Sequence, residues 1–222
     1  IGQSGSGKTV LLKSILGLIK AERGNIIFGD KLISNMKQKE RAELRQDIGM
    51  VFQGSALFDS INVEENVMFP MKMFTNKHHT EILDRANVAI KRVNLINSNH
   101  KMPAELSGGM KKRVAIARAI IMNPKYLFCD EPNSGLDPKT SIIIDNLIKE
   151  ITNEFNITTV INSHDMNSVV EIGEKIIFLE EGEKKWEGSN KEIFRTNNKS
   201  VSKFVNSSEL FKKVRDVYLS KK

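Results

Sequence analysis

Residues 2–9, GQSGSGKT, have the types and spacing needed to hold the phosphates of a nucleotide. They fit the pattern G-x-x-x-x-G-K-[ST] and precede a helical pattern. In such a loop, glycines let backbone N–H groups turn onto phosphate oxygens, and the following helix N-terminus adds its positive dipole end. Lys8 would reach the β- and γ-phosphates, and Thr9 would hold Mg²⁺. We expect nucleotide contacts along this whole P-loop, from Gly2, Gln3, Ser4, Gly5, Ser6, Gly7, Lys8 and Thr9.

A pair of carboxylates follows a short apolar run in YLFCDEP, residues 126–132. A buried strand of four residues would deliver Asp130 to the carboxyl edge of a sheet, where phosphate and metal sit in nucleotide-binding α/β proteins. Asp130 would bind Mg²⁺ directly or through water. Glu131 would point to the other side of the strand and polarise an attacking water as a general base. Two buried acids without partners would cost several kcal/mol, so a structural surface cap is the weaker interpretation.

Two further polar residues close apolar runs, Gln53 in IGMVFQ and His164 in TTVINSH. Alone, a strand-terminal glutamine is usually a solvated end and a lone histidine is usually a hydrogen-bonded structural residue. Beside a P-loop and an acidic pair, both would face the nucleotide edge of the sheet. Gln53 would sense the γ-phosphate through the metal or water, and His164 would contact the γ-phosphate or the attacking water.

A second glycine loop lies in ELSGGMKKRVAIARAI, residues 105–120. Ser107, Gly108 and Gly109 precede a helical pattern, so they would form another helix N-terminus that attracts an anion. The three basic residues at 111–113 follow on the first turns of that helix. We interpret them as a solvated basic face.

The elements that must position these residues alternate between strands and helices. This alternation predicts an α/β fold, a P-loop NTPase core with a mostly parallel sheet. Antiparallel strands are expected near the N-terminus, where residues 25–28 run into a Gly-Asp turn, and the second glycine loop is expected in a helical subdomain at about residues 54–122. Strands are predicted at residues 48–53, 126–129, 158–161 and 175–179, and helices at 138–154, 165–172, 191–195 and 208–220.

The predicted domain limits are residues 1–188 for the nucleotide-binding domain and 189–222 for a basic helical extension. The sequence begins without a methionine at what resembles a junction between a strand and a loop, so we expect an N-terminal truncation. The basic extension would dock on a second copy, on anionic lipid headgroups, or on nothing.

Composition narrows the class of protein. A net charge of +7 and a pI near 9.4 suit a nucleic-acid binder, a protein near anionic lipid, or a solvated surface. The basic residues are scattered and aromatics make up only 6%, so no nucleic-acid partner is expected. No apolar run approaches the ~20 residues of a membrane span. The single Cys129, in an apolar run, suits a reduced compartment.

The order of these motifs resembles one family, the nucleotide-binding domains of ATP-binding-cassette (ABC) proteins. The resemblance rests on the P-loop, Gln53, LSGGM, YLFCDE, SGLD and His164, and it covers residues 1 to about 188. It implies an ATPase that uses ATP and Mg²⁺ and works as a head-to-tail dimer. In that dimer the second glycine loop faces the ATP of the other copy, and Asp137 couples the two sites. The segment after Gln53 would dock a transmembrane permease, and the adenine-stacking aromatic residue of the family would lie before residue 1.

A finer resemblance depends on Met110, which stands where the family usually has Gln. With residues 51–70 and DEPNSGLDP, it is similar to the Mla or Mce type, whose ATPases drive phospholipid transport across the bacterial envelope. This resemblance implies an Mce-domain lipid-binding subunit beside the permease, and a peripheral place on the cytoplasmic face of the inner membrane. The alternatives are the ATPase of another importer or exporter, and a soluble cassette that acts on ribosomes or DNA. A P-loop kinase or GTPase would leave LSGGM and His164 unexplained.

Overall fold

The computed structural model describes residues 1–220. The described chain forms two units, residues 21–161 and residues 1–20 together with those from 162 onward, and each is described by itself. We refer to them as the helical-sheet unit (21–161) and the P-loop unit.

The helical-sheet unit is built on three strands in the order β3, β4, β5. Strand β3 (Ile48–Val51) runs parallel to β4 (Tyr126–Asp130), and β5 (Thr158–Asn162) lies beside β4, its last residue beginning the other unit. Four of the five β4 residues are buried. A continuous apolar run is what a strand covered on both faces requires, which is why YLFCD forms the middle strand.

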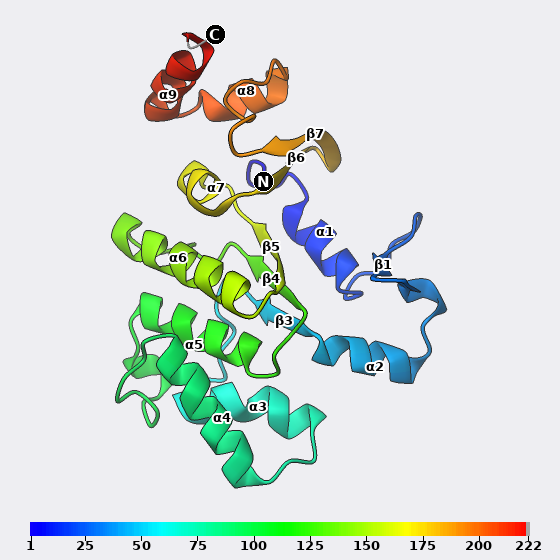
Figure 1. Cartoon of the computed structure of the whole chain (residues 1–222), viewed down its shortest axis with the longest axis vertical. Coiled ribbons are helices and arrows are strands. Elements are labelled where there is room, and N and C mark those ends of the chain that lie inside the picture. The colour runs from blue at the N-terminus through cyan, green and yellow to red at the C-terminus, as the bar shows by residue number, and fades with distance from the viewer. Residues whose placement is uncertain (221–222) are drawn as a thin grey trace. The chain divides into compact units, whose positions relative to one another are not determined.

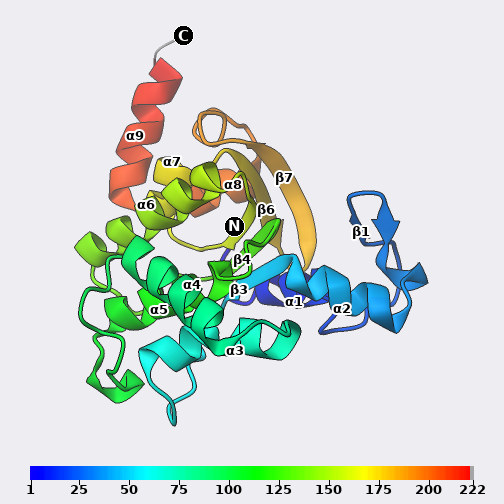
Figure 2. The ribbon, with the colours of Figure 1, turned by 60° about the horizontal axis from the view of Figure 1, so that its bottom comes forward.

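Helices cover this sheet and extend beyond it. In Figures 1 and 2, α3, α4 and α5 lie side by side, and the residues of all three pack together. This grouping confirms the expected helical subdomain around the second glycine loop. The helices of the unit are α2 (Gln38–Gln46), α3 (Val63–Phe74), α4 (His79–Arg92), α5 (Gly108–Ile120) and α6 (Pro138–Glu154), with short 3₁₀ helices at Ile33–Asn35 and Pro103–Glu105. The expected antiparallel strands near the N-terminus are β1 (Ile27–Phe28) and β2 (Lys31–Leu32).

One apolar cluster holds sheet and helices together. Val67 of α3, Ile116 of α5, Leu127 of β4 and Ile148 of α6 are each fully buried within it. Each such side chain contributes roughly 1.5–3 kcal/mol relative to an exposed position. The sheet and the four helices α3 to α6 therefore share one core.

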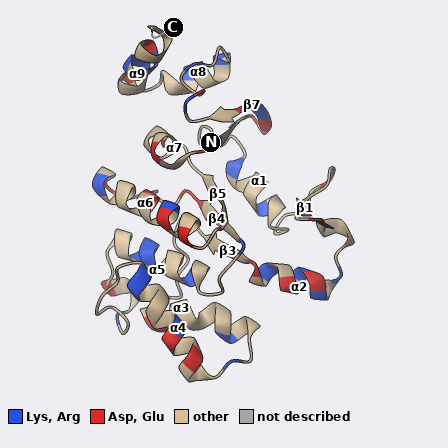
Figure 3. Cartoon of the chain, in the orientation of Figure 1, with Lys and Arg blue, Asp and Glu red and all other residues tan. Residues whose placement is uncertain are grey.

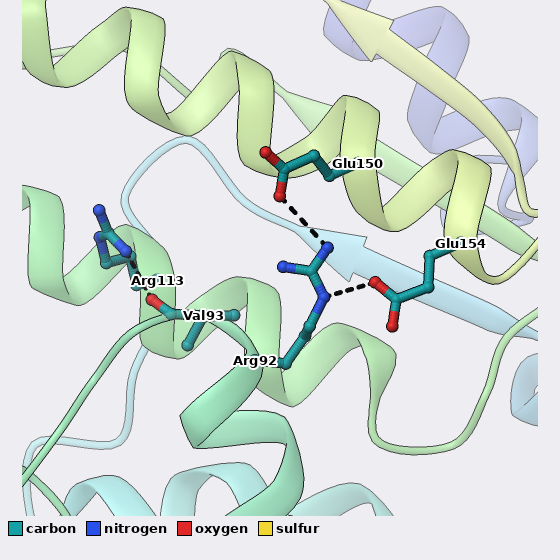
Figure 4. A network of polar contacts seen from close by, with 5 residues as sticks. All are labelled: Arg92, Val93, Arg113, Glu150 and Glu154. Atoms are coloured by element: carbon teal, nitrogen blue, oxygen red, sulfur yellow. Dashed lines mark hydrogen bonds and ion pairs between the residues drawn. The ribbon is translucent and has the colours of Figure 1, made fainter.

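Polar contacts add to this core where α4, α5 and α6 meet (Figure 4). The Arg92 guanidinium donates to Glu154 at 2.5 Å and Glu150 at 3.3 Å on α6, and Arg113 of α5 donates to the carbonyl of Val93 at 2.6 Å. Both glutamates are exposed, so the ion pairs contribute roughly 0–1 kcal/mol each. They fix the end of α4 against its neighbours more than they stabilise the unit.

The P-loop unit has a second, smaller core around β6, where Phe178, Ile193 and Val201 are buried together. Strand β6 pairs antiparallel with β7 through a tight turn at Glu181 and Gly182, both with positive φ. Two successive residues of positive φ give a turn whose twist matches that of the strands it joins. The elements are α1 (Lys8–Ile15), α7 (Met166–Ile172), β6 (Lys175–Glu180), β7 (Glu183–Ser189), α8 (Lys199–Val205) and α9 (Glu209–Ser220).

Of three predictions about this unit, one was incomplete, one was wrong and one is confirmed. Residues 175–179 form a strand as predicted, but it pairs antiparallel with β7, which the sequence pattern did not indicate because EKKWEGS is almost entirely polar. Residues 191–195 form turns instead of a helix. The Glu192 carboxylate accepts from the Ser189 backbone N–H at 2.7 Å and from its hydroxyl at 2.8 Å, which closes a local turn. The predicted helix at 208–220 is confirmed as α9.

Replacing Gly49 by Ala should lower the free energy of unfolding by about 1–3 kcal/mol, because the new Cβ would overlap the carbonyl oxygen of Ala119 where β3 packs under α5. The backbone of Gly49 is in an ordinary conformation, so the cost is steric. Gly54→Ala is the matched control, since a Cβ there meets open space. Thermal melting followed by circular dichroism would contradict the packing argument if both variants melted together.

Candidate functional site

The P-loop wraps the start of α1 with its backbone pointing inward. Gly7 caps α1 in the left-handed conformation, with φ 98°, and no side chain caps the helix. The first N–H groups of α1 are therefore left for a ligand, as in anion sites at helix N-termini. Residues 3–5 are exposed at the tip of the loop, while Gly2, Ser6 and Lys8 are buried.

Two side chains of the loop fit a bound phosphate. The Lys8 ammonium, 5% exposed, donates to the carbonyls of Gly2 at 2.9 Å and Gln3 at 3.0 Å, which holds it across the loop. The Ser6 hydroxyl is buried and has no hydrogen-bond partner among residues 1–220. A buried hydroxyl without a partner is costly, and a phosphate oxygen would satisfy it. The geometry of the loop thus fits the phosphate cradle that the sequence predicts, and phosphate binding at these residues stays a prediction.

Strand β6 fixes the first turn of the P-loop. The Ile1 ammonium donates to the Ile177 carbonyl at 2.7 Å and the Leu179 N–H donates to the Ile1 carbonyl at 2.8 Å, the alternation of a parallel pair. Gly2 then passes so close to β6 that a Cβ would overlap the Leu179 carbonyl oxygen. Only glycine fits here.

His164, also in the P-loop unit, is exposed on the segment between β5 and α7.

The acidic pair lies in the helical-sheet unit at the end of β4, as predicted. Asp130 is the last residue of the strand and is 6% exposed. Glu131 follows with φ 45°, in the left-handed region that non-glycine residues rarely adopt. Backbone strain of this kind costs of order 1–3 kcal/mol and is concentrated at functional sites. The strain turns Glu131 out of the strand direction while leaving Asp130 in the sheet.

Gln53 and Glu131 are brought together, although 78 residues separate them. The Gln53 amide donates to the Glu131 carboxylate at 3.3 Å and to the Ser134 hydroxyl at 3.3 Å. β3 and β4 are parallel neighbours, so the residues that follow them emerge at the same edge. Ser134 is a contact that the sequence pattern did not assign.

Thr9 in the P-loop unit, and Gln53 and Asp130 in the helical-sheet unit, each carry oxygen atoms of the kind that magnesium binds. Among residues 1–220 no group of three or more His, Cys, Asp or Glu side chains could hold a metal on its own. A Mg²⁺ ion that keeps several waters and binds substrate phosphates needs no such cage. When bound, it would polarise the phosphoryl oxygens of the nucleotide.

The second glycine loop is the N-terminus of α5. Ser107 is its N-cap and accepts from the Met110 N–H at 3.3 Å, a long hydrogen bond. Ser107 and Gly108 are exposed, whereas eight residues further along α5 are buried. Met110 packs against the large apolar cluster. This helix therefore presents an exposed N-terminus on a buried body.

Asp137 caps the neighbouring helix α6. Its carboxylate accepts from the Thr140 N–H at 3.0 Å and from the Thr140 hydroxyl at 2.5 Å, and these bonds lower the pKa of Asp137. A Cβ on Gly109 would lie 2.8 Å from the Thr140 methyl group, so the two helix starts are in close contact. The predicted coupling residue thus lies beside the second glycine loop, with its charge engaged in a cap.

One interpretation of the basic residues was wrong. Figure 3 shows Lys and Arg on helices of both units, including α1, α2, α5 and α6. Most are exposed, but Lys112 is 4% exposed, and Arg113 donates to a backbone carbonyl. The sequence held the signal: Lys112 lies four residues before Ile116 and seven before Ala119, so it falls on the buried stripe of α5.

Residues on both sides of Gln53 in the sequence line a groove of about 430 Å³. Its wall includes Phe52, Phe58 and Phe69, and the centroids of the Phe58 and Phe69 rings lie 4.5 Å apart. Arg45 and Arg118 are the charged residues lining it. It is therefore an apolar groove with a cationic element.

Comparison with known proteins agrees with this arrangement. Residues 1–134 match the model of the family described as ABC transporter. The chain belongs to the ABC transporter family. It carries the family's ATPase domain, and its α/β fold with P-loop, parallel strands and helical subdomain is that of an ABC cassette.

The chain is similar to ATP-binding proteins of transport systems. The methionine import ATP-binding protein MetN of Campylobacter jejuni is 39% identical over 94% of this chain and 67% of its own length. A probable ribonucleotide transport ATP-binding protein, mkl, of Mycobacterium leprae is 40% identical over 75% of this chain and 48% of its own. The chain thus spans about half to two thirds of these relatives.

Solved structures give the same family. An ATP-binding cassette solved as a dimer in a post-hydrolysis state with ADP and Pi aligns with a TM-score of 0.77 and 34% identity, over 85% of this chain and 83% of that one. The cbiO1 protein of Clostridium perfringens, part of the transporter complex cbiONQ, aligns with a TM-score of 0.80 and 33% identity, over 98% and 84%. No helix among residues 1–220 of this ABC cassette is long and apolar enough to span a membrane.

Replacing Glu131 by Gln should reduce ATP turnover by about 100-fold or more while leaving ATP binding intact, because the amide cannot accept a proton from water. Glu43→Gln, an exposed change on α2, is the control. Steady-state ATPase assays and titration with a fluorescent ATP analogue would measure the two properties separately. Hydrolysis by the variant at the wild-type rate would remove Glu131 from the reaction.

Proposed function

We propose that this chain is the ATP-hydrolysing subunit of an ABC transporter that moves phospholipid across the bacterial envelope and works as a head-to-tail dimer. The observation that carries the dimer is the second glycine loop. It is an exposed helix N-terminus, of the kind that attracts an anion, on a helix most of whose residues are buried, in a chain that already has a P-loop. A ligand phosphate from a second copy would complete it, and a similar cassette has been solved as a dimer.

The residues divide the reaction between them. The P-loop with Lys8 would hold the ATP phosphates, Thr9 and Asp130 would take Mg²⁺, and Glu131 would accept a proton from the attacking water. Gln53, which touches Glu131, would place that water or the metal, and His164 would contact the γ-phosphate. Two ATP molecules would bridge each P-loop to the opposite second glycine loop, and hydrolysis would release that bridge.

A permease is the proposed membrane partner, docked at the groove lined by residues on both sides of Gln53. Its aromatic wall and lack of acidic lining suit an apolar segment of another protein. Because Gln53 touches Glu131 and the adjacent Phe52 lines the groove, movement of the permease would reach the reacting groups through one short segment. This arrangement would place the chain peripherally on the cytoplasmic face of the inner membrane.

The lipid cargo rests on the Met110 signature and residues 51–70, which resemble Mla and Mce ATPases. Met110 packs its thioether side chain against the apolar cluster, which a glutamine would do less favourably. The resemblance adds an Mce-domain lipid-binding subunit as a third partner. The names of the relatives favour a second candidate, import of an amino acid or a nucleotide.

Head-to-tail assembly predicts that two inactive variants restore each other. Lys8→Ala removes the P-loop cation, and Ser107→Arg places a bulky cation in the loop that faces the other copy's ATP while sparing binding at its own Lys8. In a mixed dimer both changes fall in one site, so the other site is intact. ATPase assays of the mixture should exceed either variant alone. Activity no higher than that of the separate variants would argue against the sandwich.

The cargo is tested by the partners. A tagged chain extracted from its own bacterial membranes should copurify with a permease and an Mce-domain protein, identified by mass spectrometry, and phospholipid should stimulate ATP hydrolysis by that complex. Copurification with a methionine- or nucleotide-binding protein, with stimulation by that solute and none by phospholipid, would assign the second candidate. The chain with Lys8→Ala should assemble but not hydrolyse ATP, which separates assembly from turnover.

A further inference from the structure

Residues 53–56, the Gln53 loop, are held by basic side chains from a single helix. The Lys112 ammonium of α5 donates to the backbone carbonyl of Gln53. Further along the same helix, Arg118 donates to the carbonyls of Ser55 and Ala56, each at 2.7 Å. Both ends of the loop are therefore tied to α5, the helix that begins at the second glycine loop.

Lys112 occupies a costly position for a lysine. Its side chain is 4% exposed, and the residues one turn further along α5, Ala115 and Ile116, are apolar and buried. Burial lowers the pKa of Lys112, and the nearby Cys129 and Glu131 oppose that shift. Burying an ammonium group is unfavourable unless it is paired, and an apolar residue would fill the space at lower cost. Packing alone therefore does not explain a lysine here.

Its contact gives a reason. Lys112 holds the Gln53 backbone, and the Gln53 amide in turn donates to Glu131 at 3.3 Å. Four residues before Lys112, α5 starts at Gly108 behind its cap Ser107. A continuous set of contacts thus runs from the second glycine loop, through Lys112 and Gln53, to the acid at the end of β4, all within the helical-sheet unit.

We propose that Lys112 is a positioning residue, which fixes Gln53 so that its amide meets Glu131 and links the second glycine loop to that acid. The proposal rests on the proposed head-to-tail dimer for its consequence. The second glycine loop serves the ATP of the other copy, whereas Glu131 serves the ATP of its own. Lys112 therefore couples ATP binding at one site to the position of the reacting groups at the other site, through contacts inside a single subunit.

The first test replaces Lys112 by Met in the full chain, which keeps a flexible apolar stem and removes the donor. The turnover number should fall roughly 10- to 100-fold, as for small displacements of reacting groups, while the KM for ATP stays within about twofold because the P-loop is untouched. Lys112→Gln keeps an N–H donor on a shorter stem, and its turnover number should lie between those of Lys112→Met and the wild type. Lys91→Met, at an exposed position of α4, is the control with the same charge change.

A double-mutant cycle decides whether Lys112 acts through Gln53. Gln53→Ala removes the amide that Lys112 positions, so adding Lys112→Met to it should lower turnover no further. Multiplicative losses would overturn the proposal, as would a Lys112→Met enzyme with wild-type turnover. The proposal would also be overturned if the loss of turnover in Lys112→Met and in Lys112→Gln simply matched the fall in the melting temperature of each variant. A wild-type chain without ATPase activity would instead refute the proposed function.

Discussion

The structure depends on helices whose N-termini stay open to an anion. The first N–H groups of a helix have no partner within it, so they must bind a cap, water or a ligand. α1 and α5 meet this requirement differently. Gly7 gives α1 no side-chain cap at all, whereas Ser107 gives α5 a long bond at 3.3 Å. Both arrangements leave donors for phosphate, but only α1 is preceded by a complete loop with a buried lysine.

The glycines of the second loop are constrained by packing as well as by ligand approach. A Cβ on Gly108 would lie 3.3 Å from Leu136, and one on Gly109 would lie 2.8 Å from Thr140. The start of α5 therefore lies directly against the start of α6. Since Asp137 is bonded to the same Thr140, a displacement of either helix start would disturb the other. Because Gly108 and Gly109 are small, the start of α5 and the start of α6 pack in contact, so a shift of one would move the other.

Much of this arrangement could be predicted from spacing, because backbone chemistry leaves few options. A glycine pattern before a helix specifies an anion site, and an apolar run ending in Asp130 specifies a buried strand with its acid at the sheet edge. Contacts between distant residues were only partly accessible. That β3 and β4 are neighbours brings Gln53 to Glu131, but the left-handed backbone of Glu131 and the contact with Ser134 have no sequence signature.

Two of the errors, at Lys112 and at β7, share a cause. Hydrophobic periodicity treats charged residues as exposed, so it assigned Lys112 to a solvated face and gave no strand at Glu183–Ser189. The buried ammonium of Lys112 donates a hydrogen bond to a backbone carbonyl, and β7 forms because pairing with β6 fixes its backbone even where its side chains are polar. In both cases hydrogen bonding to the main chain, which composition does not reveal, determined the outcome.

The two basic anchors of the Gln53 loop differ in a way that suits its role. Arg118 uses two N–H groups of one planar guanidinium, and its charge lies 5.9 Å from the centre of the Phe58 ring, so its geometry is fixed in several directions. Lys112 offers an ammonium on a flexible stem and makes one contact with the loop, at Gln53. An ammonium can keep a hydrogen bond while the angle changes, whereas a planar fork cannot. The loop is therefore anchored rigidly beside the groove and adjustably beside Glu131, which lets Gln53 shift without releasing α5.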